Sequence, residues 1–280
     1  MHSLFTAILP YITSPISWIA LIGGACLGSF LNVCIYRIPK GIFWRDSRSR
    51  CPHCGAPMPL WHNIPVFSWI LLRGKAACCG NKISPQYPLV ELFSAVSMVF
   101  IYWTFPFVID LPSFQFDSAE TLRFFHASIF FSLLLVCSVI DIHLQIIPDV
   151  LSLPMVAATP LIIFFHPELD WKSGLYGVIF GGGVLYAVAI TYYFVRKEVG
   201  LGMGDVKLLA GIGGWLGYQS LLPTLFIASV TGAVFGIALM LITRSVNLKL
   251  KVPFGPFLAA GAMLFLLYGQ QINEFLFYTE

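Results

Sequence analysis

Long apolar runs make up most of this chain, and short stretches of charged residues, proline and glycine separate them. About 20 apolar residues in a row are enough for a helix to cross the hydrocarbon core of a membrane. Runs that reach or approach this length lie at 16–36, 88–109, 124–147, 150–166, 174–195, 206–218, 221–243 and 255–273. The pattern therefore predicts about eight transmembrane helices, of which 206–218 is the shortest.

Composition agrees with this pattern. Hydrophobic residues make up 58% of the 280 residues and charged residues only 10%, whereas a soluble domain has roughly 45–50% and about 25%. We therefore expect an all-α polytopic membrane protein. The polar stretch after the first run predicts a division into a first transmembrane helix (1–36), a Cys-rich loop subdomain (37–87) and a larger transmembrane domain (88–280).

Basic residues predict which way the helices face. The 37–87 loop contains one acid, Asp46, and many basic residues: Arg37, Lys40, Arg45, Arg48, Arg50, Arg73, Lys75 and Lys82. Cytoplasmic loops are enriched in Lys and Arg, so we expect this loop on the cytoplasmic side. Threading eight helices from there places 14 of the 16 basic residues inside and most acidic loop residues outside. The net charge of +3 reflects this bias and gives no reason to expect a nucleic-acid partner.

Two aspartates interrupt the apolar background, Asp141 in SVIDIHLQIIPD and Asp205 in GLGMGDVK. A charged carboxylate at the centre of a membrane helix costs about 2.5–3.5 kcal/mol on insertion scales, so acids in or near such helices are functional candidates. The threading brings both aspartates to the cytoplasmic face. Two carboxyl groups can share one proton and activate water, as in aspartic proteases. We therefore predict that Asp141 and Asp205 form a catalytic pair.

The acids near this pair have simpler interpretations. Pro148 is expected to end the third helix, and Asp149 is then expected to cap the fourth helix rather than to catalyse a reaction. Asp205 precedes the apolar segment VKLLAG, so a capping role remains open for it as well. Asp141 lies within an apolar helix, where capping does not explain it.

Glycines favour a site at Asp205. Gly200, Gly202 and Gly204 alternate before it, and glycine lets backbone segments approach closely, which suits a loop that admits an extended peptide beside the carboxylate. Lys207 either contacts an acidic group of a substrate or lipid, or extends to the membrane surface without a specific partner.

Cysteines of the loop form a second group of candidate residues. Cys51 and Cys54 lie in a C-x-x-C with a Pro-His-Cys-Gly turn, the usual half of a tetrahedral zinc site. Cys78 and Cys79 follow later in the same loop. A reducing cytosol favours a metal over a disulfide. We predict a structural zinc, because a loop with few aliphatic residues needs such a crosslink.

Glycine pairs in the apolar runs predict close helix packing. Gly24 and Gly28, Gly177 and Gly181, and Gly232 and Gly236 each have the G-x-x-x-G spacing. Small residues at this spacing let two membrane helices approach closely.

Several motifs occur in a fixed order along the chain: GSFLNVCIYRIPK (28–40), CPHCG (51–55), NIPVFSW (63–69), LRGK (72–75), ISPQYPLVE (83–91), IDIHLQIIPD, GMGD and PFGP (253–256). With this ordered set the chain resembles the type IV prepilin peptidases, the bacterial leader peptidases and N-methyltransferases of pilus and type II secretion systems. The GxGD element alone is shared with presenilin-like and archaeal preflagellin proteases.

The resemblance implies an aspartic endopeptidase of the bacterial inner membrane, with Asp141 and Asp205 as its catalytic pair facing the cytoplasm. It implies as substrates prepilins or pseudopilins with a short basic leader, a glycine before the cut, an aromatic residue after it and a hydrophobic helix beyond. The 88–280 segment is then the peptidase domain.

The resemblance also implies methylation of the new amino terminus with S-adenosylmethionine in the region of the 37–87 loop. Asn32 in GSFLNV and Glu91 at the end of YPLVE are the candidates near this region. A hydrogen bond within the helix bundle would also explain Asn32, and an interaction with the helix dipole would also explain Glu91.

This chain departs from the family at its second C-x-x-C. The first cysteine of that motif falls on Ala76, and Cys79 matches the second. Cys78, His53 or His62 is then expected to replace the missing ligand, and we predict the set Cys51, Cys54, Cys78 and Cys79.

Two other classes of protein compete with this interpretation. A secondary transporter also carries acids within a helix bundle, but it needs repeat symmetry and midplane charges, which this sequence does not show. A non-enzymatic scaffold of a secretion machine predicts that loss of the aspartate pair has no effect.

Overall fold

The structure is a computed structural model that describes residues 14–43, 50–51, 53–110, 115–166, 168–197, 202–243 and 252–277. The chain divides into two compact units, Met1–Phe124 and Phe125–Glu280. The described residues are mainly helical. They also contain a two-stranded antiparallel sheet of β1 (Val108–Asp110) and β2 (Gln115–Phe116).

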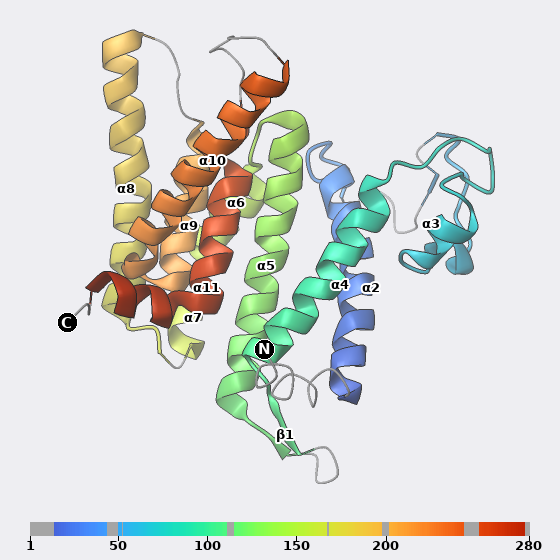
Figure 1. Cartoon of the computed structure of the whole chain (residues 1–280), viewed down its shortest axis with the longest axis horizontal. Coiled ribbons are helices and arrows are strands. Elements are labelled where there is room, and N and C mark those ends of the chain that lie inside the picture. The colour runs from blue at the N-terminus through green and yellow to red at the C-terminus, as the bar shows by residue number, and fades with distance from the viewer. Residues whose placement is uncertain are drawn as a thin grey trace. The chain divides into compact units, whose positions relative to one another are not determined.

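The first unit is built on two long helices, α2 (Pro15–Arg37) and α4 (Gln86–Thr104), which pack side by side (Figure 1). The glycines of α2 explain the close approach. A Cβ atom added to Gly24 would lie 2.8 Å from the Cα of Ala95, and one added to Gly28 would lie 2.7 Å from the Cα of Glu91. The predicted close packing at this G-x-x-x-G pair is confirmed.

The described residues of the loop between these helices contain little regular structure. It carries a short 3-10 helix, η1 (Leu60–Asn63), and the short helix α3 (Phe67–Leu71). Helix α4 ends at Thr104 rather than at the predicted residue 109, because Pro106 disfavours a helical conformation at the residue before it.

Helix α5 (Ser118–Leu144) begins in the first unit and continues into the second. Asp117 starts it, with its Oδ1 accepting the N–H of Ala119 at 2.8 Å. The helix ends before the predicted Ile147. Gln145 takes a left-handed conformation with a φ of 54°, and its N–H donates to the Asp141 carbonyl oxygen at 2.9 Å. Asp141 therefore lies in the last turn of α5.

The predicted helix 150–166 is two short helices in the structure, α6 (Asp149–Ala157) and α7 (Thr159–Phe165). Pro160 explains the break, because proline cannot donate the backbone hydrogen bond that a continuous helix requires and its ring disfavours helix at the preceding residue. The prediction of a single helix is wrong here.

The remaining elements of the second unit are α8 (Trp171–Arg196), α9 (Met203–Leu216), η2 (Tyr218–Ser220), α10 (Leu221–Thr243) and α11 (Gly255–Phe277). Helix α11 is kinked at Tyr268. Helix α9 corresponds to the shortest predicted segment, yet it contacts α6, α7, α8, α10 and α11 and lies at the centre of the unit. Its side chains Leu208, Leu209 and Ile212 are completely buried in the hydrophobic core.

Glycine also sets the packing of α8 on α9. A Cβ atom on Gly181 would lie 2.6 Å from the Leu209 carbonyl oxygen, and one on Gly177 would overlap the carbonyl of Gly213. The prediction for this pair is confirmed. The prediction of close packing is wrong for Gly232 and Gly236. A Cβ on Gly232 meets only the Phe257 ring, at 3.5 Å, and one on Gly236 meets no described atom within 4 Å.

Five helical segments in the described part of the chain are long and apolar enough to cross a membrane: α2, α4, α5, α8 and Tyr218–Ile242. The other predicted segments are also helical but shorter, namely α6 with α7, α9, and the apolar part of α11, Gly255–Gly269. The prediction of an all-α polytopic membrane protein is confirmed, and the number of eight crossings stays a prediction.

Candidate functional site

Asp141 has a defined hydrogen-bond partner in the second unit. Its side chain is buried, with 6% of the residue exposed, and its Oδ2 accepts the backbone N–H of Gly255 at 2.9 Å. Gly255 is the first residue of α11 and belongs to the PFGP segment. A Cβ on Gly255 would lie 2.8 Å from the same carboxylate oxygen, so only glycine fits there without a shift.

Asp205 lies in the first turn of α9 and is partly buried. The helix begins after Gly202, whose carbonyl oxygen accepts the Asp205 N–H at 3.1 Å. The capping interpretation of Asp205 is therefore wrong, since Gly202 is the N-cap residue. A Cβ on Gly202 would lie 3.3 Å from Asp205 Oδ2, so glycine leaves this side of the carboxylate open. Gly200 lies outside the described residues.

Ile147, in the loop after α5, lies close to the glycines next to both aspartates. A Cβ on Gly204 would lie 2.8 Å from the Cβ of Ile147, and one on Gly255 would lie 3.2 Å from the Cδ1 of the same isoleucine. The end of α5, the start of α9 and the start of α11 therefore meet at Ile147.

Asp149 and Lys207 form an ion pair that joins α6 to α9, with Nζ and Oδ1 2.6 Å apart. Pro148, rather than Asp149, is the N-cap of α6, and no side chain caps this helix. The predicted capping role of Asp149 is therefore wrong, because its carboxylate bonds to the lysine instead. Lys207 has a partner within the protein, which neither sequence interpretation included.

The four predicted metal ligands of the first unit lie together. The sulfur atoms of Cys51, Cys54, Cys78 and Cys79 are all within 4.8 Å of one another, and all four are free thiols. Sulfur atoms around a tetrahedral zinc with Zn–S bonds of about 2.3 Å are about 3.8 Å apart. The Cys51 and Cys79 sulfurs are 3.7 Å apart and those of Cys54 and Cys78 are 3.3 Å apart, so the residues present fit zinc.

Two similar turns build this cluster. The Gly55 N–H donates to the Cys51 carbonyl oxygen at 2.9 Å, and the Gly80 N–H donates to that of Ala76 at 2.7 Å. Both glycines have positive φ, 71° and 70°. Ala76 thus occupies the position that Cys51 has in the first turn, as the sequence suggested. Cys78 supplies the fourth sulfur of the cluster.

Neither His53 nor His62 belongs to the cysteine cluster. The His53 Nε2 lies 3.3 Å from the carbonyl oxygen of Lys82, and His62 is not grouped with the sulfur atoms. The structure therefore groups Cys78, and neither histidine, with the other three cysteines.

Backbone N–H groups favour the thiolate form of Cys51, which is the form that binds a metal. The N–H groups of Cys54 and His53 point to the Cys51 sulfur and lower the pKa of its thiol to about 6. The thiols of Cys54 and Cys51 raise the pKa of Cys78 to about 12. Cys51 is then a thiolate at neutral pH, whereas Cys78 holds its proton until a cation displaces it.

Glu91 and Asn32 lie on the facing sides of α4 and α2. Glu91 is in the second turn of α4, and its Oε2 accepts the N–H of Val66 at 2.7 Å. The helix-dipole interpretation is wrong, because the carboxylate binds the loop instead. Val66 has a φ of 64°, which is unusual for a β-branched residue. The Asn32 Nδ2 donates to the Tyr87 carbonyl oxygen at 3.0 Å, as the hydrogen-bonding interpretation predicted.

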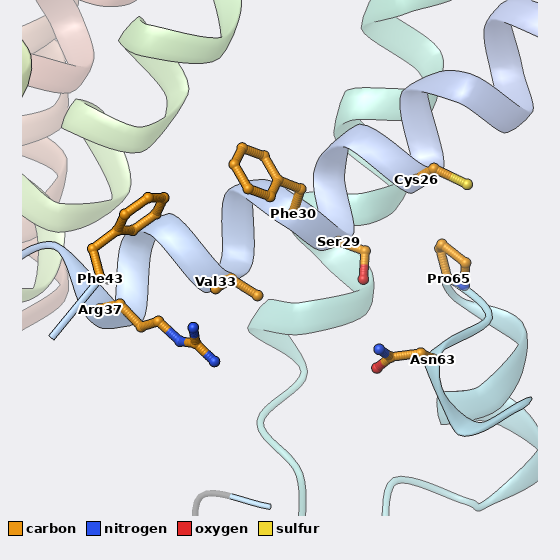
Figure 2. Close-up of a pocket in the computed structure, with 8 residues that line it drawn as sticks. All are labelled: Cys26, Ser29, Phe30, Val33, Arg37, Phe43, Asn63 and Pro65. Atoms are coloured by element: carbon orange, nitrogen blue, oxygen red, sulfur yellow. The ribbon is translucent and has the colours of Figure 1, made fainter. Parts of the chain in front are cut away.

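The first unit also contains two cavities that the sequence does not reveal. A cavity of about 390 Å³ lies between α2 and the 63–65 segment. Figure 2 shows Ser29, Val33 and Arg37 along one face of α2, with Asn63 and Pro65 opposite them. A larger cavity of about 620 Å³ is lined by α2, the cysteine loop and the start of α4, and it includes Asn32 and Glu91.

Comparison with known proteins covers both units. Residues 22–105 match the bacterial peptidase A24 N-terminal domain, and residues 128–237 match the type IV leader peptidase family. No solved structure gave a significant match.

Relatives resemble the chain over most of its length. The prepilin leader peptidase/N-methyltransferase of Stutzerimonas stutzeri is 34% identical over 93% of this chain and 94% of its own. The proteins of the same name from Pseudomonas aeruginosa and Dichelobacter nodosus are 32% and 33% identical, over 95% and 89% of this chain and 96% and 90% of their own. The chain therefore belongs to the type IV leader peptidase family.

Proposed function

We propose that this protein removes the leader peptide from prepilins or type II secretion pseudopilins, using Asp141 and Asp205 as its catalytic pair. The observation that carries this proposal is that the segments bearing the two aspartates, from helices far apart in the sequence, both approach Ile147. The names of the relatives supply the reaction class. Membership of a peptidase family also argues against the transporter and scaffold interpretations.

The proposed cleavage mechanism uses the carboxyl groups of Asp141 and Asp205, which are partly shielded from water. The ionised aspartate accepts a proton from a water molecule, which attacks the scissile carbonyl, while the protonated one donates to the carbonyl oxygen. As the C–N bond breaks, the carboxyl group that took the proton from water protonates the leaving amine, and the other carboxylate takes back the proton that it gave to the carbonyl oxygen. The Gly255 N–H holds one oxygen of Asp141 in place, so that its other oxygen remains for water or substrate.

Gly202 supports the site by keeping a side chain away from Asp205, and Gly204 supports it by letting the start of α9 approach Ile147. The open side of Asp205 at Gly202 leaves room for an extended peptide. Lys207 holds α6 against α9 through Asp149, close to the pair. We propose that the site faces the cytoplasm at the bacterial inner membrane, which the distribution of Lys and Arg supports. The division at residues 36 and 87 stays a prediction.

We also propose that the protein methylates the new amino terminus and that this activity belongs to the first unit. Cys51, Cys54, Cys78 and Cys79 would hold a structural zinc there, and Asn32 and Glu91 belong to the methylation region. When bound in this unit, S-adenosylmethionine would supply the methyl group that is transferred to the new amino terminus.

Replacement of each aspartate tests the peptidase assignment. We expect Asp141→Asn and Asp205→Asn each to abolish cleavage of a prepilin by the purified protein, because a fixed neutral amide cannot exchange proton roles. Asp149→Asn is the matched control, and it removes an exposed ion pair worth up to about 1 kcal/mol of stability. Mass spectrometry of the product, with and without S-adenosylmethionine, measures cleavage and methylation together. Near-normal cleavage by either aspartate variant would falsify the assignment.

A further inference from the structure

An exposed apolar surface lies on the loop between α2 and α4. We call it the loop surface, and it consists of five large side chains that are each more than half exposed in the described part of the chain: Trp61, Ile64, Phe67, Ile70 and Leu71. Ser68 and Trp69 of the same segment line the larger cavity instead. A cluster of exposed apolar side chains marks a contact with a membrane or with another protein.

A hydrogen bond places the start of α3 level with the membrane-spanning part of α2. The Val66 N–H donates to Glu91 Oε2 at 2.7 Å, and a Cβ atom on Gly28 would lie 2.7 Å from the Cα of Glu91. Gly28 lies about 13 Å along the axis of α2 from Arg37, the last residue of that helix. Arg37 is the first Lys or Arg after the apolar run, so it marks the membrane surface. Half of the hydrocarbon core is about 15 Å thick, so Val66 lies at the depth of the acyl chains.

The smaller cavity indicates the same depth. Asn63 and Pro65 line it from the loop, and Cys26 and Phe30 line it from α2. Figure 2 shows Pro65 at the Cys26 end of this cavity and Arg37 at the other end. Cys26 and Phe30 are exposed, and on a membrane-spanning helix such residues face lipid. The apolar face of α2 therefore continues across the cavity to the loop surface.

Backbone at this depth must find its hydrogen-bond partners within the protein, because acyl chains offer none. Four N–H groups of the segment donate to acceptors in the first unit: those of Val66, Ser68, Ile70 and Leu72. The Ser68 hydroxyl donates to the Trp61 carbonyl oxygen at 2.9 Å, and the Trp69 Nε1 donates to that of Ile83 at 3.2 Å. These polar groups are satisfied without water.

Positive charge follows the loop surface directly. Arg73 and Lys75 are exposed, and residues 50–90 contain no acidic residue. Basic side chains beside an apolar face bind the anionic headgroups of phospholipids. Trp61 suits the same boundary, because tryptophan is enriched where a membrane meets water. Depth, apolarity and charge thus fit a lipid surface.

We propose that the loop surface is inserted into the bilayer, in the leaflet at the Arg37 end of α2. Its apolar side chains contact acyl chains, and Arg73 and Lys75 contact anionic phospholipid headgroups. The loop that carries the cysteine cluster is then held against the membrane by its own side chains as well as by α2 and α4.

Photolabelling of the unaltered full-length protein tests this placement. The protein is reconstituted in vesicles of phosphatidylethanolamine and phosphatidylglycerol, with a trace of phosphatidylglycerol that carries a diazirine in its acyl chain. Trypsin releases residues 51–73 as one peptide, because no Lys or Arg lies between its ends. We expect label at 61–71 and none at 51–58. Label in α2 and α4 without label at 61–71 overturns the proposal.

A benzophenone amino acid at position 71 gives a second, position-specific readout. It should crosslink to phospholipid, because Leu71 is the most exposed residue of the loop surface. The same probe at Asn81, an exposed residue beside the turn of the cysteine cluster, is the matched control and should give at least about tenfold less lipid adduct. Equal yields at the two positions, or a crosslink from position 71 to a second copy of the chain, overturn the proposal.

Arg73→Gln combined with Lys75→Gln tests the headgroup contact. With phosphatidylglycerol and phosphatidylcholine carriers compared, the wild type should prefer the anionic lipid for labelling at 61–71. The double variant should lower this preference by at least about fivefold, the effect of one basic residue near an anionic membrane. Arg196→Gln combined with Lys197→Gln removes the same charge at the end of α8 and should leave the preference unchanged. A preference that is equal in the wild type and the loop variant overturns the role of the two basic residues.

Discussion

Cys78 is the residue through which this chain compensates for Ala76. Ala76 occupies the position equivalent to Cys51, so the second turn lacks one thiolate, and the neighbouring Cys78 brings its sulfur within 3.3 Å of that of Cys54. Adjacent residues on a turn rarely point to the same metal, so Cys78 and Cys79 would be an unusual pair of ligands. Its chemistry can be tested with substitutions of one or two side chains.

Exchange of Cys78 tests its role as a ligand. We expect about one zinc per chain in the wild type and loss of the metal in Cys78→Ser, since a hydroxyl is a poor zinc ligand. Ala76→Cys in the Cys78→Ser background should restore zinc, because the first turn shows that a cysteine fits that position. Metal analysis measures the zinc content of both variants, and limited proteolysis measures how ordered the loop remains. Full zinc content in Cys78→Ser would show that the fourth ligand is another residue.

The same thiols predict how metal binding depends on pH. Zinc binds thiolates, so it must displace the proton of Cys78, whose pKa is raised to about 12. Cys51, with a pKa lowered to about 6, is ionised above that pH and protonated below it. Zinc affinity should therefore fall as the pH falls, and more steeply below about 6. Competition with a chelator across this range measures it, and an affinity independent of pH would exclude thiolate ligands.

At the scale of the helices, the packing of α8 on α9 positions Asp205. Helix α9 lies at the centre of the second unit, and its first turn carries the aspartate, so a shift of α9 would displace the carboxylate. Gly177 and Gly181 allow α8 to approach the backbone of α9. Helix α8 also contains Gly183. A Cβ atom added to Gly183 would meet no other described atom within 4 Å.

This contrast predicts different effects for the same substitution. Gly177→Ala should destabilise the protein by about 1–3 kcal/mol and reduce prepilin cleavage, because the added methyl group meets backbone rather than a movable side chain. Gly183→Ala should leave both unchanged. Thermal unfolding in detergent and the cleavage rate are the measurements. Equal stability of the two variants would show that α8 and α9 do not pack as closely as described.

At the scale of the whole molecule, the distribution of charge predicts the orientation in the membrane. Single cysteines for labelling, introduced into a functional background, should react with an external impermeant reagent at positions 117 and 168 and should not react at positions 48 and 247. The reason is that basic loops remain in the cytoplasm. Positions 48 and 247 lie outside the described residues. The reverse labelling pattern would place the aspartates on the wrong side for removal of a cytoplasmic leader.

Sequence alone was sufficient wherever the controlling interaction is local or repeated. Apolar runs predicted the long helices of the described residues, because a membrane helix satisfies its own backbone hydrogen bonds and needs only an apolar surface. Asp141 and Asp205 could be recognised because an acid is rare and costly against such a background. The C-x-x-C at Cys51 is also visible in the spacing of residues, whereas the replacement at Ala76 is implied by the resemblance to the family.

Tertiary structure decided the features that join distant segments. These include the Gly255 N–H that binds Asp141, the contacts of Ile147, the ion pair of Asp149 with Lys207, and the hydrogen bond from Val66 to Glu91. The central place of α9 belongs with them. No local pattern determines such contacts, because each depends on how two backbones approach each other. The cavity beside Asn32 follows from the same cause, since its walls come from helices and a loop that only folding brings together.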